Sequence, residues 1–112
     1  MPVESNATVD SIEDRRGDEG DLQNPAGDIS SGVSAEVGDV SVFTIYLDVA
    51  GAIDITVEAS PNGRDDWFEL QESPISFSEA GETAVQIEYN VTDIRLTGSD
   101  GTAVKAVLRE VV

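Results

Sequence analysis

From Val40 onward the chain contains several stretches in which apolar and polar side chains alternate residue by residue. Successive side chains of a β-strand point to opposite faces, so this pattern indicates strands with one buried face. The alternating apolar residues are Phe43, Ile45, Leu47, Val49, Ile53, Ile55, Val57, Ala59, Val85, Ile87, Tyr89, Ile94, Leu96, Val104, Ala106 and Leu108. No stretch shows the repeat of about 3.6 residues that an amphipathic helix requires. The pattern therefore predicts an all-β fold.

Glycine-containing turns separate the alternating stretches. We interpret Ala50–Gly51 and Ser99–Gly101 as tight hairpin turns, in which glycine supplies the positive φ that such turns need. Pro61–Arg64 is a further turn, and a short strand that begins near Trp67 follows it. The expected architecture is a small antiparallel β-sandwich of about six to eight strands over residues 39–112.

Residues 1–38 lack this alternation and are rich in Gly, Ser, Asp and Glu. Isolated apolar residues in such a composition cannot build a core alone, so we predict an extended N-terminal arm that is ordered by contact with other chains. An arm of this kind could add a strand to the open sheet edge of a neighbour. The expected contact residues of the arm are Ile12, Arg15, Arg16, Leu22 and Ile29.

The chain has 23 acidic and 6 basic residues, a formal net charge of -17, and the acids occur in the alternating stretches as well as in the arm. On a small folded surface that charge repels itself at ordinary ionic strength, whereas in molar salt the screening length falls to about 3 Å. This composition resembles that of proteins from haloarchaea and their viruses, and we interpret it as adaptation to a high-salt cytoplasm. Because the same charge repels nucleic-acid phosphates, no nucleic-acid partner is expected.

Cysteine and histidine are both absent, which excludes disulfides, thiolate and imidazole catalysis and the usual zinc sites. Two acid pairs, Asp65 with Asp66 and Asp48 with Asp54, have the chemistry of a Ca²⁺ site or of a general acid and base, but such pairs arise by chance in a chain this acidic. With no histidine and one lysine, nothing obvious activates a Ser or Thr hydroxyl. We expect no enzyme activity, no catalytic or metal-binding residues and no cofactor. No basic and apolar leader is visible, and no run approaches the roughly 18 apolar residues that cross a bilayer, so no membrane association is expected.

Residues 47–70 resemble a recurring hairpin of small virion proteins in tailed viruses. In that hairpin a strand ends in serine, an Asn-Gly turn follows, here Asn62 and Gly63, and a tryptophan, here Trp67, opens the next strand. Residues 91–97, with an arginine between apolar positions, resemble another strand of the same proteins. Both motifs lie in the predicted β-domain, and neither covers the arm. We predict that Asn62, Gly63 and Trp67 have a structural role, with Trp67 closing the hairpin over the edge of the sandwich.

The resemblance implies a non-enzymatic structural protein of a haloarchaeal tailed virus, most directly a capsid decoration, cement or turret protein. It would bind the major capsid protein at the virion surface. Such proteins often act as trimers, and a domain this small buries only part of its apolar surface, so we also expect self-association as a homotrimer or another homo-oligomer. Two alternatives remain open: a tail or baseplate component of the same virus, and a carbohydrate-binding or adhesion β-sandwich module. An adhesion module needs an exposed aromatic platform, which one Trp and two Tyr supply sparsely.

The free energy of unfolding should fall steeply as salt is removed, because the repulsion among the acidic side chains is then no longer screened. Circular dichroism from about 3 M down to about 0.1 M KCl measures the folded fraction. Sucrose is the control, since it stabilises by exclusion without screening charge and should replace KCl only in part. A chain that stays fully folded at the low end contradicts the halophilic interpretation.

Overall fold

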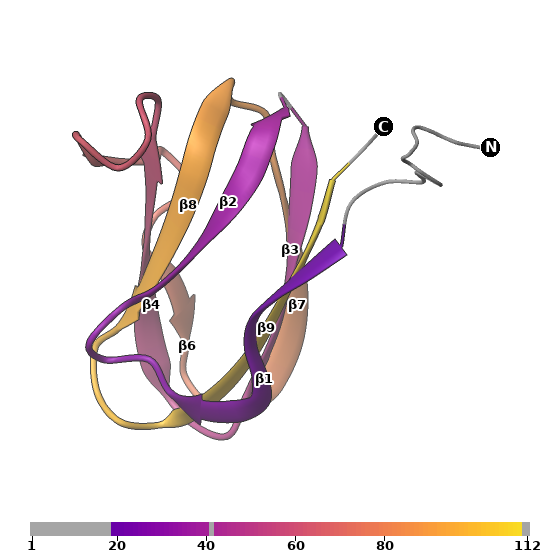
Figure 1. Cartoon of the computed structure of the whole chain (residues 1–112). Coiled ribbons are helices and arrows are strands. Elements are labelled where there is room, and N and C mark those ends of the chain that lie inside the picture. Colours follow the sequence, from indigo (N-terminus) through magenta and orange to yellow (C-terminus); the bar gives the residue numbers. More distant parts are fainter. Residues whose placement is uncertain (1–18, 41, 111–112) are drawn as a thin grey trace, which may run out of the picture.

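The computed structural model describes residues 19–40 and 42–110, and there it shows nine strands in two antiparallel sheets packed face to face (Figure 1). The strands are β1 (Glu19–Asp28), β2 (Val33–Val40), β3 (Phe43–Val49), β4 (Ile53–Ser60), β5 (Phe68–Glu69), β6 (Ile75–Phe77), β7 (Gly81–Ile87), β8 (Val91–Gly98) and β9 (Ala103–Glu110). One sheet has the order β1-β9-β3-β7; the other has the order β2-β8-β4-β5, with β6 also pairing with β4. The predicted all-β sandwich is confirmed.

The strands pair in a nested order. β1 pairs with β9, β2 with β8, β3 with β7 and β4 with β6, and successive pairs alternate between the two sheets. This is the strand arrangement of a jelly roll, in which one long hairpin wraps around to form both sheets. Because of the nesting, the first described strand lies beside the last one (Figure 1).

The inward-facing side chains of both sheets form one apolar core. All of the alternating apolar residues of β3 and β4 are at most 3% exposed, as the pattern predicted. Phe43, Ile45 and Ile55, for example, have no exposed surface, and burial of such a side chain contributes about 1.5–3 kcal/mol relative to its exposure. The alternation therefore marks the face of each strand that meets the opposite sheet.

Residues 19–38, which we expected to belong to an extended arm, form β1 and most of β2, and the structure corrects that expectation. Leu22 and Ile29 are 6% and 0% exposed, so they are core residues rather than contacts for another chain. Val37, with 0% exposure, joins them. The β-domain therefore includes this segment and does not begin at residue 39.

Irregular pairing explains why the alternation did not reveal these two strands. The register of β1 against β9 shifts on both sides of Gln23, and that of β2 against β8 shifts between Glu36 and Val40. A bulge places an extra residue in one strand and reverses the face on which later side chains lie. The period of two is then lost in the sequence, although the backbone still pairs with its neighbour.

Two of the predicted hairpin turns are wrong. Ala50–Gly51 connects β3 to β4 and Ser99–Gly101 connects β8 to β9, and each connection passes from one sheet to the other. The backbone N–H of Ser99 donates to the carbonyl of Asp54 (2.9 Å), which fixes the second connection against the start of β4. Alternation identifies the buried face of a strand but not the sheet to which the next strand belongs. Pro61–Arg64, by contrast, does connect the antiparallel pair β4 and β5.

Ile29→Ala should lower the free energy of unfolding by about 2–5 kcal/mol, because it leaves a cavity in a core position without exposed surface. Denaturant unfolding in high salt measures the change. Ser31→Ala, at an exposed position in the same connection, is the matched control and should change stability by less than about 0.5 kcal/mol. Equal stability of Ile29→Ala and wild type would mean that this segment is dispensable for folding.

Candidate interaction surfaces

The connection between β4 and β5 contains the predicted hairpin residues and is held by a dense set of hydrogen bonds. The hydroxyl oxygen of Ser60 accepts from the backbone N–H groups of Asn62 (3.3 Å) and Arg64 (2.8 Å). The N–H of Gly63 donates to the hydroxyl of Thr92 (2.8 Å), whose hydroxyl in turn donates to the carbonyl of Ser60 (3.2 Å). Gly63 and Arg64 have φ values of 73° and 78°, the left-handed conformation that favours glycine. The turn is thereby fixed to the beginning of β8.

Two arginines connect this hairpin to the outer side of the five-stranded sheet. Arg64 Nε donates to a carboxylate oxygen of Asp93 at 2.7 Å, and the Asp93 side chain is only 4% exposed. Arg95 pairs with Glu58 at 2.9 Å, and its guanidinium carbon lies 4.2 Å from the centre of the Trp67 ring. One face of the half-buried Trp67 ring is therefore covered by a cation, an arrangement worth about 0.5–1 kcal/mol at a partly exposed site. The contact is consistent with the predicted structural role and leaves that ring face unavailable for stacking.

Tyr46 and Phe68 are the exposed large hydrophobic residues of the described part of the chain, at 49% and 59%. In a regular strand Phe68 and Leu70 would lie on the same face, yet Leu70 is only 7% exposed. β5 contains just Phe68 and Glu69, so the alternation ends before Leu70, whose N–H donates to the carbonyl of Val57 (3.0 Å). The short strand thus leaves one aromatic ring in solvent while the next apolar residue enters the core.

Phe68 borders a concavity of about 600 Å³ at the edge of the five-stranded sheet. The residues that line it are Ala59, Pro61, Phe68, Glu69, Leu70, Gln71, Tyr89, Asn90 and Val91. Apolar and aromatic side chains dominate, and a few polar groups lie among them, which is the usual make-up of a binding cleft. We call this set of residues the Phe68 groove.

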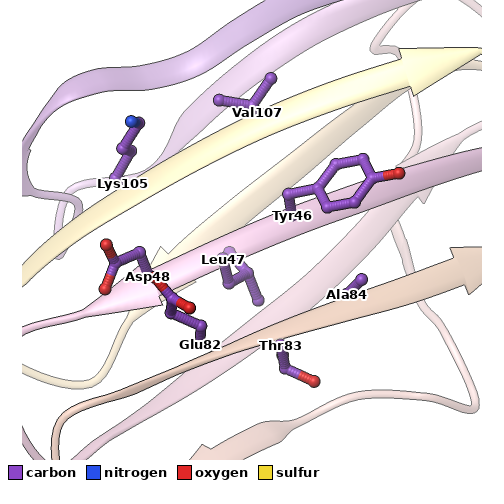
Figure 2. A pocket seen from close by; sticks show the side chains of 8 residues that line it. All are labelled: Tyr46, Leu47, Asp48, Glu82, Thr83, Ala84, Lys105 and Val107. Atoms are coloured by element: carbon purple, nitrogen blue, oxygen red, sulfur yellow. The ribbon is translucent and has the colours of Figure 1, made fainter.

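Tyr46 lies in a smaller concavity of about 430 Å³ on the outer face of the four-stranded sheet (Figure 2). In the strand register, Tyr46 is flanked by Ala84 of β7 and Val107 of β9, which gives an apolar row across three strands. The next row consists of Lys105, Asp48 and Glu82, and Figure 2 shows these side chains on β9, β3 and β7 respectively. We call these two rows the Tyr46 surface.

The structure places the two acid pairs named in the sequence analysis differently. Asp48 and Asp54 belong to different sheets, and in the connection after β4 the Asp66 carboxylate is occupied in accepting from the side-chain amide of Asn62 (2.8 Å). Within residues 19–40 and 42–110, no group of three or more Asp, Glu, His or Cys side chains is placed to hold a metal ion. The same residues include no helix of the length and apolar character that a membrane span requires.

Of the predicted contact residues of the arm, Leu22 and Ile29 lie in the core, and Ile12, Arg15 and Arg16 lie outside the described residues. No sequence pattern indicates the Phe68 groove, because the groove depends on the exposed position of Phe68 at the edge of the folded sheet.

Comparison of the chain with protein-family models and with curated proteins found no match.

Two exposed carboxylates cap connections at the same end of the sandwich. Asp28 accepts from the N–H of Ser30 and Asp100 from the N–H of Thr102, each at 2.8 Å. The hydrogen bond from the Ser30 N–H is the main cause of a lowered pKa of Asp28, and the Ser30 hydroxyl is the second cause. For Asp100 the Thr102 hydroxyl is the main cause of the lowered pKa, and the Thr102 N–H is the second. Because the folded pKa is lowered, each carboxylate stabilises the fold above its unfolded pKa, and that stabilisation is lost as pH falls through the folded pKa.

Thr102→Val removes the hydroxyl that contributes most to the low pKa of Asp100, so this pKa should rise towards its ordinary value of 3.8. NMR titration of the side-chain carboxyl carbons in high salt measures the pKa directly. The pKa of Asp28, held by Ser30, should stay low in the same variant and serves as the internal control. An unchanged pKa of Asp100 would mean that the hydroxyl does not stabilise the carboxylate.

Proposed function

We propose that this protein is a non-enzymatic structural protein of a haloarchaeal tailed virus, most directly a capsid decoration or turret protein that binds the major capsid protein at the virion surface. The observation that carries the proposal is the Phe68 groove, in which an aromatic ring is 59% exposed at the open edge of a sheet. Exposed aromatic side chains beside a pocket are typical anchors of protein interfaces.

The charge of the rest of the surface supports the same proposal. Most acids of the described residues point to solvent: Asp28, Glu36, Asp48, Asp54, Asp65, Asp66, Glu69, Glu72, Glu79, Glu82, Glu88 and Asp100. In molar salt the attraction and repulsion of exposed charges extend only about 3 Å, so long-range electrostatics contribute little to binding. Apolar contact keeps its strength under these conditions. A surface for partner binding in such a medium therefore has to be apolar, as the Phe68 groove is.

The hairpin before Phe68 supports binding through preorganisation. Residues 47–70, which resemble the hairpin of small virion proteins, end at this groove. The bonds of Ser60 and the ion pair of Arg64 with Asp93 hold the turn in one conformation. A rigid binding surface loses less conformational entropy on association than a mobile one, so more of the contact energy appears as affinity. A tail or baseplate component of the same virus would use the same surface on a different partner.

A carbohydrate-binding module is the second candidate, favoured by one observation. Phe68 and the partly buried Tyr89 line the same groove as Glu69, Gln71 and Asn90, so aromatic rings and hydrogen-bonding groups converge there. Jelly rolls occur in lectins as well as in viral capsid proteins, and the topology alone does not separate the two. Trp67 does not line this groove and has a cation over one ring face, so a sugar in the groove would stack on Phe68 or Tyr89.

Phe68→Ser should leave the protein folded, because the ring is largely in solvent, and should weaken binding to virus particles by at least about tenfold. Cosedimentation with particles that lack the protein, in about 3 M KCl, measures binding, and circular dichroism checks the fold. Asp65→Ser, an exposed change in the connection just before β5, is the control and should bind as wild type does.

The same pair of variants on a glycan array separates the two candidates. Wild-type binding to glycans that Phe68→Ser abolishes, without binding of either protein to particles, would replace the virion proposal with the carbohydrate-binding one. Unchanged particle binding by Phe68→Ser would exclude the Phe68 groove as the capsid contact.

A further inference from the structure

The proposed capsid contact does not use the Tyr46 surface, because this surface lies on the other sheet. We propose that a second copy of this chain docks on it about a two-fold axis that runs along β3. The evidence is the order of charged and apolar side chains across β9, β3 and β7, which complements itself when one copy is turned over onto another. This inference holds for any function of the protein.

The apolar row supplies the centre of the contact. Tyr46 is 49% exposed, and on either side of it Ala84 is exposed and Val107 is half-buried. Figure 2 shows the Tyr46 ring lying between these two small side chains on the open face of the sheet. A large aromatic ring with small apolar neighbours, surrounded by charges, has the composition of an interface centre with a polar rim.

Two of the four cations of the described residues lie on β9 in the four-stranded sheet. Lys105 and Arg109 both lie on exposed positions of β9, and Arg64 and Arg95 lie around the five-stranded sheet. Lys105 is the single lysine of the chain. In a protein with a net charge of -17, the Lys105 ammonium gives the Tyr46 surface a group that a carboxylate of a second copy can meet.

The strand register decides how the second copy is oriented. Lys105 and Glu82 lie on opposite sides of Asp48 in the same row. Rotation about an axis parallel to β3 exchanges the β9 side with the β7 side, so Lys105 of each copy faces Glu82 of the other, and Val107 faces Ala84. A two-fold contact is self-complementary, so each such pair forms twice.

The other face-to-face orientation is disfavoured by charge. An axis perpendicular to the strands through Tyr46 would place Lys105 of one copy against Arg109 of the other, because these residues flank the apolar row on β9. Like charges in an interface are destabilising, and this contact would form twice. In the favoured orientation, one like-charge contact remains. The Asp48 carboxylate lies next to the axis and faces Asp48 of the second copy.

Sedimentation equilibrium of the full chain, in KCl concentrations that keep it folded, tests the proposal. Wild type should form a dimer whose dissociation constant rises by at least about tenfold in Lys105→Glu and in Glu82→Lys. The double variant Lys105→Glu with Glu82→Lys restores the pair with reversed charges and should return to within about threefold of wild type. Asp48→Asn should strengthen the dimer, because it removes the repulsion beside the axis.

Circular dichroism and thermal melting show that each variant is folded, and Asp65→Ser, which lies off this surface, should dimerise as wild type does. A wild-type protein that is monomeric or trimeric under these conditions overturns the proposal. Stronger association of Lys105→Glu would indicate the perpendicular orientation and overturn the one proposed. Failure of the double variant to recover, with its fold intact, excludes the pairing of Lys105 with Glu82. None of these outcomes depends on binding to virus particles.

Discussion

Burial of aliphatic side chains between the two sheets is the interaction on which the rest of this structure depends. The side chains that fill this space are mainly Ile, Val and Leu, and Phe43 is the aromatic one among the fully buried side chains of the described residues. β-Branched side chains are stiff and pack well on a pleated surface, so a core made of them can be well ordered with few aromatic rings. Because one face of each strand supplies the core, the other face is free to carry acids.

The nested pairing makes this core cooperative along the whole described chain. β1 and β2 lie beside β9 and β8, so the two ends of the described chain complete each other's sheets. Contacts between residues so far apart in sequence form late and slowly compared with local ones. They also mean that Leu22, Ile29 and Val37 are needed to close the same core as the residues of the last strand. An arm detached from the sandwich would leave two central strands, β8 and β9, each without a neighbour on one side.

In the proposed functions, high salt screens the charges of the surface, and the two exposed aromatic residues supply the apolar contacts that remain. Charges on this surface would keep copies and partners apart at ordinary ionic strength, and screening removes that barrier. What remains is apolar contact at Phe68 and at Tyr46, on different sheets, so that one surface can bind a partner while the other binds a second copy. Ion pairs at short range, such as Lys105 with Glu82 across the proposed axis, then determine orientation and also contribute to affinity.

The sequence by itself determined which apolar residues of β3, β4 and β9 form the inner face, since regular alternation in an amphipathic strand leaves one choice of that face. It also determined the hairpin after β4, because Asn62 and Gly63 permit the tight turn found there. Tertiary structure alone decided that residues 19–38 are strands, because bulges in β1 and β2 hide the period and only pairing with β9 and β8 supplies their backbone partners. It likewise decided that Ala50–Gly51 crosses between sheets and that Phe68 is exposed. Both depend on which strands become neighbours, and that is settled by packing across the whole domain rather than by local propensity.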